Sequence, residues 1–298
     1  MLRSKLASSL MQVVANRSFS TKPSSRRLTR KQRSCRTEPL EVRQLLTGDF
    51  VWVNAVGSTG SDQATDVTTD SAGNVYTTGT FSGTVDFDPG SGVTNLTSPS
   101  GTTGMFVTKV NSNGVLIWAR GLLVGGGFGS VNPASIAVDS AGNVLTTGAF
   151  SATVDFDPGV GVTNISSSLD IDAFVSKLDS SGNFVWAKSV GGGGPSVQMD
   201  RGTGIAVDST GNVYTAGFFT GTADFDPGSG TTQLVSAGLN DVFVWKLNSA
   251  GIFQWARRMG GEGVILVRAS RSTLSAMFTR RATSTGRLIS IQALVFAS

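Results

Sequence analysis

The pentapeptide Asp-Phe-Asp-Pro-Gly occurs three times in this sequence, at a constant spacing of 69 residues. Two carboxylates separated by one residue project from the same side of an extended strand. Carboxylate oxygens are also the ligands that calcium prefers in proteins. The paired aspartates are therefore candidate calcium ligands. They are Asp86 with Asp88, Asp155 with Asp157, and Asp224 with Asp226.

A structural role is the second interpretation of this motif, and we favour it. Calcium takes about 6–8 oxygen ligands, whereas each motif supplies two carboxylates and lacks the further Asp and the distal Glu of an EF-hand loop. On a strand, Phe87 would point away from the carboxylates and into the packing of the sheet. Pro89 and Gly90 would then end the strand, because proline has no N–H and glycine permits positive φ. Calcium stays the alternative, and we expect no other cofactor.

Little else in the sequence points to catalysis. There is no histidine, so the commonest general base and the usual Ser/His and Cys/His pairs are missing. The single cysteine, Cys35, excludes a disulfide within this chain and a cysteine-based zinc site. Arg120 and the pair Asp200–Arg201 depart from the repeat but form no recognisable catalytic set. We therefore expect no catalytic residues.

The charge is distributed unevenly along the chain. Residues 1–50 hold eleven Lys or Arg and three acids, whereas residues 51–260 hold eight Lys or Arg and sixteen acids. The acidic central segment would repel phosphate, so we expect no nucleic-acid partner. All sixteen of these acids are Asp, a residue typical of turns, and this favours strands and loops over helices.

The elements that carry the motif are predicted to be short strands. Apolar runs of four to eight residues, rich in Val, Ile, Phe and Thr, alternate with Gly, Asn, Asp and Ser. Asp139-Ser-Ala-Gly-Asn143 is typical of a hairpin turn, as is Asp179-Ser-Ser-Gly182. Each unit therefore contains about four or five strands, and the fold class is all-β.

The repeated fragments IAVDSAGNVLTTG and FVSKLDSSGNFVWAKS resemble the bacterial β-propeller repeat known as SBBP, and the resemblance covers residues 48–260. It implies secreted or surface proteins with closed multi-bladed rings, without a common activity. We expect β-propeller-like tandem repeats of about 69 residues, with three in-frame units that make an incomplete propeller. The units span about 48–113, 114–181 and 182–250, and a fourth begins at 251.

One tryptophan recurs at a fixed place in each unit. A fixed place in a repeat favours packing between blades, and stacking on sugars is the alternative. These residues are Trp52, Trp118, Trp186 and Trp255.

Residues 1–47 form a basic leader, which we expect to be disordered. Its Arg- and Ser-rich composition, without an acid before Glu38, looks like a mitochondrial transit peptide. Arg36–Leu46, however, resembles the EPLEPRxLL segment at the N-terminus of surface proteins in planctomycete bacteria, with Val42 in place of the usual proline. That resemblance implies bacterial export, so the mitochondrial signal is interpreted as false. No run approaches the ~20 apolar residues of a membrane span.

The repeat stops after Gly261, and residues 261–298 hold five Arg and no Asp. Read one base out of frame, the codons for Leu266–Ala293 permit G-T-G-I-A-V-D-S-x-G-N-V-Y-T-T-G-x-F-x-G-T-A-D-F-D-P-G, which matches residues 202–228. We interpret 261–298 as a frameshifted tail that does not fold, with the slip between Gly260 and Ile265. A genuine basic tail is the alternative.

These observations favour a non-catalytic, exported or cell-surface repeat protein that serves adhesion, scaffolding or ligand binding. The partner would be a surface glycan or a protein. A propeller-type glycan hydrolase or lyase is one alternative, and a calcium-binding surface module is the other.

Overall fold

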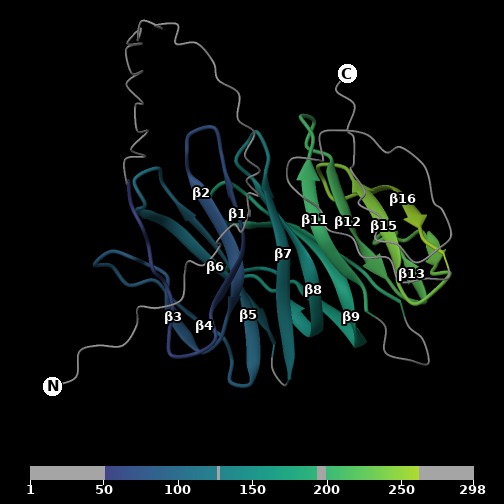
Figure 1. The fold of residues 1–298 in the computed structure, drawn as a ribbon, viewed down its shortest axis with the longest axis horizontal. Coiled ribbons are helices and arrows are strands. Elements are labelled where there is room, and N and C mark those ends of the chain that lie inside the picture. The colour runs from purple at the N-terminus through teal and green to yellow at the C-terminus, as the bar shows by residue number, and fades with distance from the viewer. Residues whose placement is uncertain (1–50, 126–127, 193–198, 262–298) are drawn as a thin grey trace, which may run out of the picture. The chain divides into compact units, whose positions relative to one another are not determined.

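The computed structural model describes residues 51–125, 128–192 and 199–261, and every regular element in these ranges is a β-strand. This confirms the expected fold class, an all-β chain of tandem β-propeller-like repeats (Figure 1). The predicted leader, and the predicted frameshifted tail from residue 262 onwards, lie outside the described residues. Within those residues, no helix is long and apolar enough to cross a membrane.

The first part of an eight-stranded sheet, which we call blade 1, is an antiparallel meander of four strands with a short hairpin inserted after the second. The four strands are β1 (Gln63–Thr69), β2 (Val75–Phe81), β5 (Thr102–Val110) and β6 (Leu116–Val124). The hairpin strands are β3 (Thr84–Asp86) and β4 (Asn95–Thr97).

Blade 2 is the second part of this eight-stranded sheet, and blade 3 is a separate four-stranded sheet; both repeat this arrangement. Blade 2 comprises β7 (Gly129–Val138), β8 (Val144–Asp155), β9 (Asn164–Leu178) and β10 (Phe184–Val190). Here β8 and β9 run on into the inserted hairpin. Blade 3 comprises β11 (Arg201–Val207), β12 (Val213–Phe219), β15 (Asp241–Leu247) and β16 (Phe253–Met259), with hairpin strands β13 (Thr222–Asp224) and β14 (Gln233–Val235).

The first two strands of each blade pair in the same register. Equivalent partners are 69 residues apart, and each blade has one irregularity at the same place in its first strand. The predicted period is therefore also the period of the hydrogen-bonded ladder. Three equivalent pairs are Gln63 with Thr80, Asn132 with Ala149, and Arg201 with Phe218.

The turn between the first two strands is made by an aspartate side chain, as the sequence predicts. In blade 1, Asp70 Oδ1 accepts the backbone N–H groups of Ala72 and Asn74, both at 2.9 Å. Gly73 takes the left-handed conformation at φ 77°, which glycine adopts without strain. The same turn recurs at Asp139 and Asp208.

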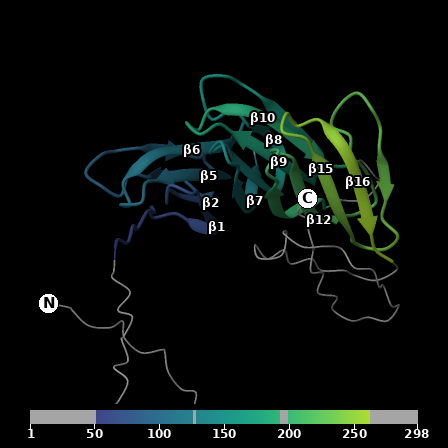
Figure 2. The same cartoon turned by 90° about the horizontal axis from the view of Figure 1, so that it is seen from above.

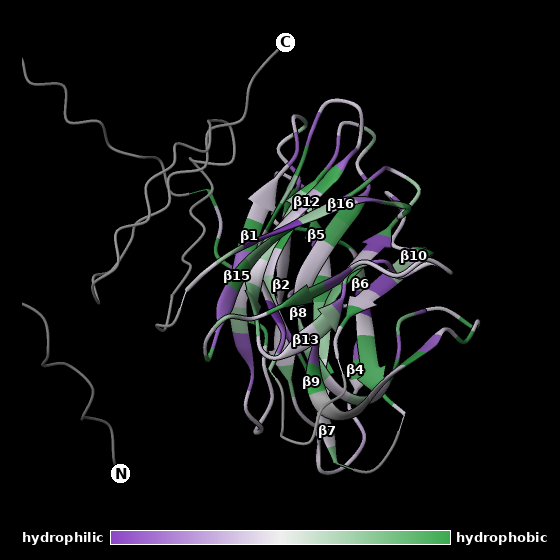
Figure 3. Ribbon diagram, turned by 90° about the vertical axis from the view of Figure 1, so that its right-hand side faces the viewer, coloured by the Kyte–Doolittle hydropathy of each residue, from purple (hydrophilic) through white to green (hydrophobic). Residues whose placement is uncertain are grey.

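Each blade packs its face on the next through apolar side chains. One cluster of buried residues joins blades 1 and 2, and a second joins blades 2 and 3. Blades 1 and 2 are also joined by backbone pairing, because Val124 at the end of β6 pairs with Val154 of β8. Figure 2 shows β6, β5 and β2 next to β7 and β8, with β15 and β16 beyond them. Figure 3 shows that hydrophobic residues lie along these strands, as the buried positions require.

Candidate functional site

The Asp-Phe-Asp-Pro-Gly motif makes the inserted hairpin of each blade. In blade 2, Asp155 Oδ1 accepts the N–H of Asp157 at 3.0 Å and that of Thr163 at 2.8 Å. Asp157 Oδ1 accepts the N–H of Gly159 at 2.8 Å. The first carboxylate thus bridges the two ends of the loop, and the second closes the turn inside it. The carboxylates of Asp86 with Asp88 and of Asp224 with Asp226 make the same bonds.

The strand ends earlier than the sequence predicts. We expected it to reach Pro89–Gly90, but β3 ends at Asp86, because the Asp86 carboxylate takes the N–H of Asp88 out of the ladder. The N–H groups of Thr94 and Asp88 that point at this carboxylate lower the pKa of Asp86 below its usual value. The carboxylate is therefore held in its charged form.

Calcium binding by these pairs stays a prediction. One oxygen of each carboxylate already accepts backbone N–H groups. In the ranges that the structure describes, no three acid, His or Cys side chains are close enough together to hold a metal ion. The geometry accounts for all six aspartates by loop closure.

The phenylalanine of the motif lies in the sheet packing, and this confirms the predicted direction of that ring. Phe156 is fully buried and meets Phe150 edge to face, with ring centroids 5.4 Å apart. Phe225 meets Phe219 in the same way, at 5.4 Å. Such aromatic pairs add about 0.5–1.5 kcal/mol beyond the apolar area that they bury.

A glycine four residues after the second aspartate completes the loop, and sequence analysis missed it. A Cβ atom built on Gly161 would overlap the Oδ2 atom of Asp157. Gly92 and Gly230 stand in the same relation to Asp88 and Asp226. The spacing Asp-Pro-Gly-x-Gly was the available signal, since only glycine leaves room for the carboxylate.

The tryptophans join each blade to the next. Trp118 Nε1 donates to the carbonyl oxygen of Ser180 at 3.2 Å, and Trp186 Nε1 donates to that of Ser249 at 3.2 Å. Both indoles are buried, at 6% and 8% exposure, which confirms that they pack between blades. Trp52 also donates to a turn carbonyl, at 2.9 Å, but it is only half-buried, and so is Trp255.

A lysine on the third strand supports the same contact, and sequence analysis did not identify it. Lys109 Nζ donates to Ser180 O at 3.3 Å, and Lys177 Nζ donates to Ser249 O at 3.4 Å. Lys177 is also paired with Asp139 at 3.3 Å, and both side chains are buried. Burial raises the pKa of Asp139, but hydrogen bonds from Asn143 and the charge of Lys177 lower it to a net value below the usual one.

Three further charged residues have structural partners, and one of them, Arg120, has an equivalent in Arg257 and so does not depart from the repeat. Arg120 Nε donates to Gly182 O at 2.9 Å, so this arginine belongs to the contact between blades 1 and 2. Asp200 Oδ1 accepts the N–H of Thr220 at 3.0 Å just before β11. Asp241 is buried and paired with Arg258 at 2.7 Å. The structure places these groups in three different contacts.

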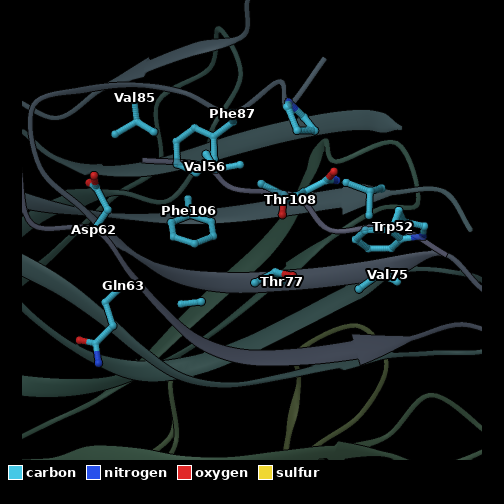
Figure 4. A pocket seen from close by; sticks show the side chains of 14 residues that line it. Trp52, Val56, Asp62, Gln63, Val75, Thr77, Val85, Phe87, Phe106 and Thr108 are labelled. Carbon is cyan, nitrogen blue, oxygen red and sulfur yellow. The ribbon is translucent and has the colours of Figure 1, made fainter. Parts of the chain in front are cut away.

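A pocket of about 260 Å³ lies on the side of blade 1 that faces away from blade 2. Its wall contains residues of β2 and β5, together with Phe87 of the motif and Trp52. Figure 4 shows Trp52 at one end of the pocket and Asp62 and Gln63 at the other. The lining is mostly apolar and contains one carboxylate, that of Asp62.

Comparisons with known proteins agree with this class of fold. The family described as a beta-propeller repeat, SBBP, matches residues 46–80 and 185–217. An uncharacterised WD repeat-containing protein of Acanthamoeba polyphaga mimivirus is 27% identical over 184 residues, which are 54% of this chain and 13% of that protein. The regulatory protein FlaEY of Caulobacter vibrioides is 30% identical over 137 residues, which are 45% of this chain and 14% of that protein.

The chain is therefore a repeat protein of the β-propeller type. It covers 13% and 14% of the length of the two curated relatives that it matches.

Proposed function

We propose that this chain binds other proteins as a non-catalytic part of a β-propeller repeat protein. The similarity to a WD repeat-containing protein supports this, because such repeats build radial sheets whose loops are free for contacts. The repeated polar residues are engaged in the fold itself: aspartates close loops, and tryptophans and lysines join blades. Binding then falls to side chains that the fold leaves exposed.

The observation that carries the proposal is the exposed tip of the motif hairpin. Val93 in blade 1 and Val162 in blade 2 occupy equivalent positions, 69 residues apart, and both are largely exposed. Val160 beside them is fully exposed. A single exposed valine is ordinary on a protein surface, but the same apolar tip recurs on blades 1 and 2, whereas blade 3 has Thr231 at the equivalent position. The two valines fit an apolar surface on a partner protein.

The proposal includes export to the cell surface, as the resemblance of Arg36–Leu46 to planctomycete leaders supports. Adhesion or scaffolding at the surface would use the same hairpin tips. A propeller-type glycan hydrolase or lyase is the competing function. It requires turnover of a glycan, which a binding module does not perform.

A photo-crosslinking amino acid placed at Val162 in the full chain, inside its source cells, tests the proposal. Val115, which is also exposed but lies in the turn before β6, provides the matched control position. We expect a protein to crosslink at Val162 and not at Val115. The purified partner should then bind the chain at least about tenfold more weakly after Val162→Asp, and unchanged after Val115→Asp.

Equal crosslinking at both positions would count against the hairpin tips. Release of sugar products from a glycan array would contradict the proposal and would support the glycan hydrolase or lyase instead. Digestion of the chain by protease added to intact cells is the expected sign of surface placement, and complete protection would contradict export.

A further inference from the structure

The two ends of the described blade series carry faces that match each other. We define the leading face as the side of blade 1 that points away from blade 2, and the trailing face as the side of blade 3 that points away from blade 2. Inside the chain, the same two kinds of face meet twice, between blades 1 and 2 and between blades 2 and 3.

Among the described residues, the leading face lacks the cover that its equivalents have. Val67 on β1 is 48% exposed, whereas the equivalent Ile136 and Ile205 are 1% and 5% exposed beneath the preceding blade. The pocket described above lies on this face, where the inner strands of a preceding blade would pack. Residues 51–56 fill the fourth position, since Trp52 and Asn54 bond to the turn carbonyls of Ser112 and Gly114 at 2.9 and 2.7 Å.

Residues 51–56 occupy the position of a fourth strand of a preceding blade, but they do not form a strand. They take the place of β6 and β10 against the following blade, but they pair with no strand among the described residues. The family matches agree, because the match at 46–80 begins before Trp52 as the match at 185–217 begins before Trp186. Val51 and Val53 are more than two thirds exposed. This segment is therefore held by few contacts.

The trailing face is preformed in the geometry that docks on a blade. In blade 1, Trp118 lies 6.3 Å from Tyr76, and Lys109 lies 5.1 Å above the Tyr76 ring. In blade 3, the equivalent Trp255 lies 6.3 Å from Tyr214, and Lys246 lies 4.9 Å above that ring.

The arginines match as well. Arg120 lies 5.8 Å from the ring of Trp118, and Arg257 lies 5.9 Å from that of Trp255. Trp118 donates to a carbonyl of the next blade, whereas no hydrogen bond joins Trp255 Nε1 to a described residue. Among the described residues, the donors on blade 3 are thus in place without acceptors.

We propose that two copies of this chain associate head to tail, with the trailing face of one copy docked on the leading face of the other. Trp255 and Lys246 then donate to Ser112 O, as Trp118 and Lys109 donate to Ser180 O. Arg257 donates to Gly114 O, as Arg120 donates to Gly182 O. The incoming strand displaces residues 51–56, which hold those same acceptors in the single chain.

A head-to-tail contact uses two different surfaces and closes when the copies complete a ring. In the present reading frame, two copies bring together six described blades, within the range of about four to eight that propellers use. In a restored frame, a fourth blade would instead cover the trailing face of blade 3 within one chain. The dimer covers both faces of both copies. This inference goes beyond the proposed function, because the partner is the chain itself.

Light scattering on the purified full chain, over a range of concentrations, tests the proposal. The expected mass is twice that of the 30.8 kDa chain. Trp255→Ala should raise the dimer dissociation constant at least about tenfold. The control Gln254→Ala, on the exposed side of the same strand, should leave it unchanged. Trp52→Ala should lower the constant, because it removes the competitor for Ser112 O.

Circular dichroism shows whether the Trp255→Ala chain folds. If it does not fold, a second variant tests the same contact. Val67→Asp places a charge on the leading face and should also give single chains. Mixing the Trp255→Ala and Val67→Asp chains leaves one intact contact, so a dimer should reappear. A wild-type chain that stays single at every concentration overturns the proposal. A Trp52→Ala chain that associates more weakly than wild type overturns it too.

Discussion

The indole nitrogen of Trp118 donates to the carbonyl oxygen of Ser180 at 3.2 Å, across 62 residues of the chain. The carbonyl lies in the last turn of blade 2, so one hydrogen bond joins the fourth strand of one blade to the next blade. Trp186 and Ser249 repeat the bond one blade further on. Blades linked in this way stabilise one another mainly through nearest neighbours, as in other repeat proteins.

Removing the motif phenylalanine of blade 2 should strongly destabilise the fold. Phe156 is fully buried and contacts both Phe150 and Phe174. Phe156→Ala should lower the free energy of unfolding by about 3–5 kcal/mol, because it leaves a cavity between packed rings. Urea unfolding followed by fluorescence measures this. Val160→Ala, at the exposed tip of the same hairpin, should change the free energy by less than about 0.5 kcal/mol.

Removing Asp139 should cost more than removing the equivalent Asp70. Asp139→Ala leaves the buried Lys177 without its carboxylate, and breaking a buried ion pair costs about 3–5 kcal/mol. Asp70 makes the same turn bonds without a buried lysine, so Asp70→Ala should cost about 1–2 kcal/mol. Chemical denaturation compares the two variants. The double variant Asp139→Ala with Lys177→Met should regain most of the loss, and a double variant no better than Asp139→Ala would contradict the account.

The fold should be insensitive to calcium. The carboxylates of Asp155 and Asp157 close their loop by accepting backbone N–H groups, and this needs no ion. The melting temperature should therefore be equal in millimolar calcium and in a chelator, as differential scanning calorimetry would report. A clear rise with calcium, lost in Asp155→Asn, would favour the calcium site instead.

Acid should weaken the turn of blade 3. Burial raises the pKa of Asp208, but hydrogen bonds from Asn212 and Thr210 outweigh it and lower the pKa to about 2. A lowered carboxylate pKa gives stability that is complete above the ordinary value of 3.8 and is lost as the pH falls through about 2. The urea concentration at the unfolding midpoint should decrease as the pH is lowered from 3.8 to about 2. Asp208→Asn should flatten this fall, and an unchanged slope would show that other carboxylates dominate.

Resequencing of the genomic DNA across codons 255–298 should show one base gained or lost relative to the DNA sequence that gives the present reading frame. The restored frame would encode a fourth Asp-Phe-Asp-Pro-Gly over the codons for Leu288–Ala293. Resequencing past the stop codon decides this directly. An unchanged frame would make residues 261–298 a genuine basic tail.

Sequence patterns predicted the features that depend on near neighbours. The turn at Asp139–Asn143 and the burial of Phe156 follow from strand alternation and from short side-chain bonds to the backbone. The early end of β3 was missed, because the Asp86 carboxylate competes with the ladder and alternation alone does not show this.

Contacts between blades were harder to predict. Lys109 and Lys177 stand at strand positions that look exposed, and their acceptors lie 71 and 72 residues away. A local sequence pattern does not indicate an acceptor so far away in the chain. The half-burial of Trp52 and Trp255 depends on which blade covers them, and a position within the repeat does not reveal it.

The identical register of the blades also bears on how the chain folds. Gly79 pairs with Phe106 in blade 1, and Gly217 pairs with Phe243 in blade 3. Strands from different blades are therefore close to interchangeable, and mispairing between them is the characteristic failure of repeat proteins. Short turns oppose such exchange, since neighbouring strands meet before distant ones. Differences between blades oppose it too, such as the equivalent Tyr76, Leu145 and Tyr214. In this chain, the sequence differences between blades therefore favour correct strand pairing during folding.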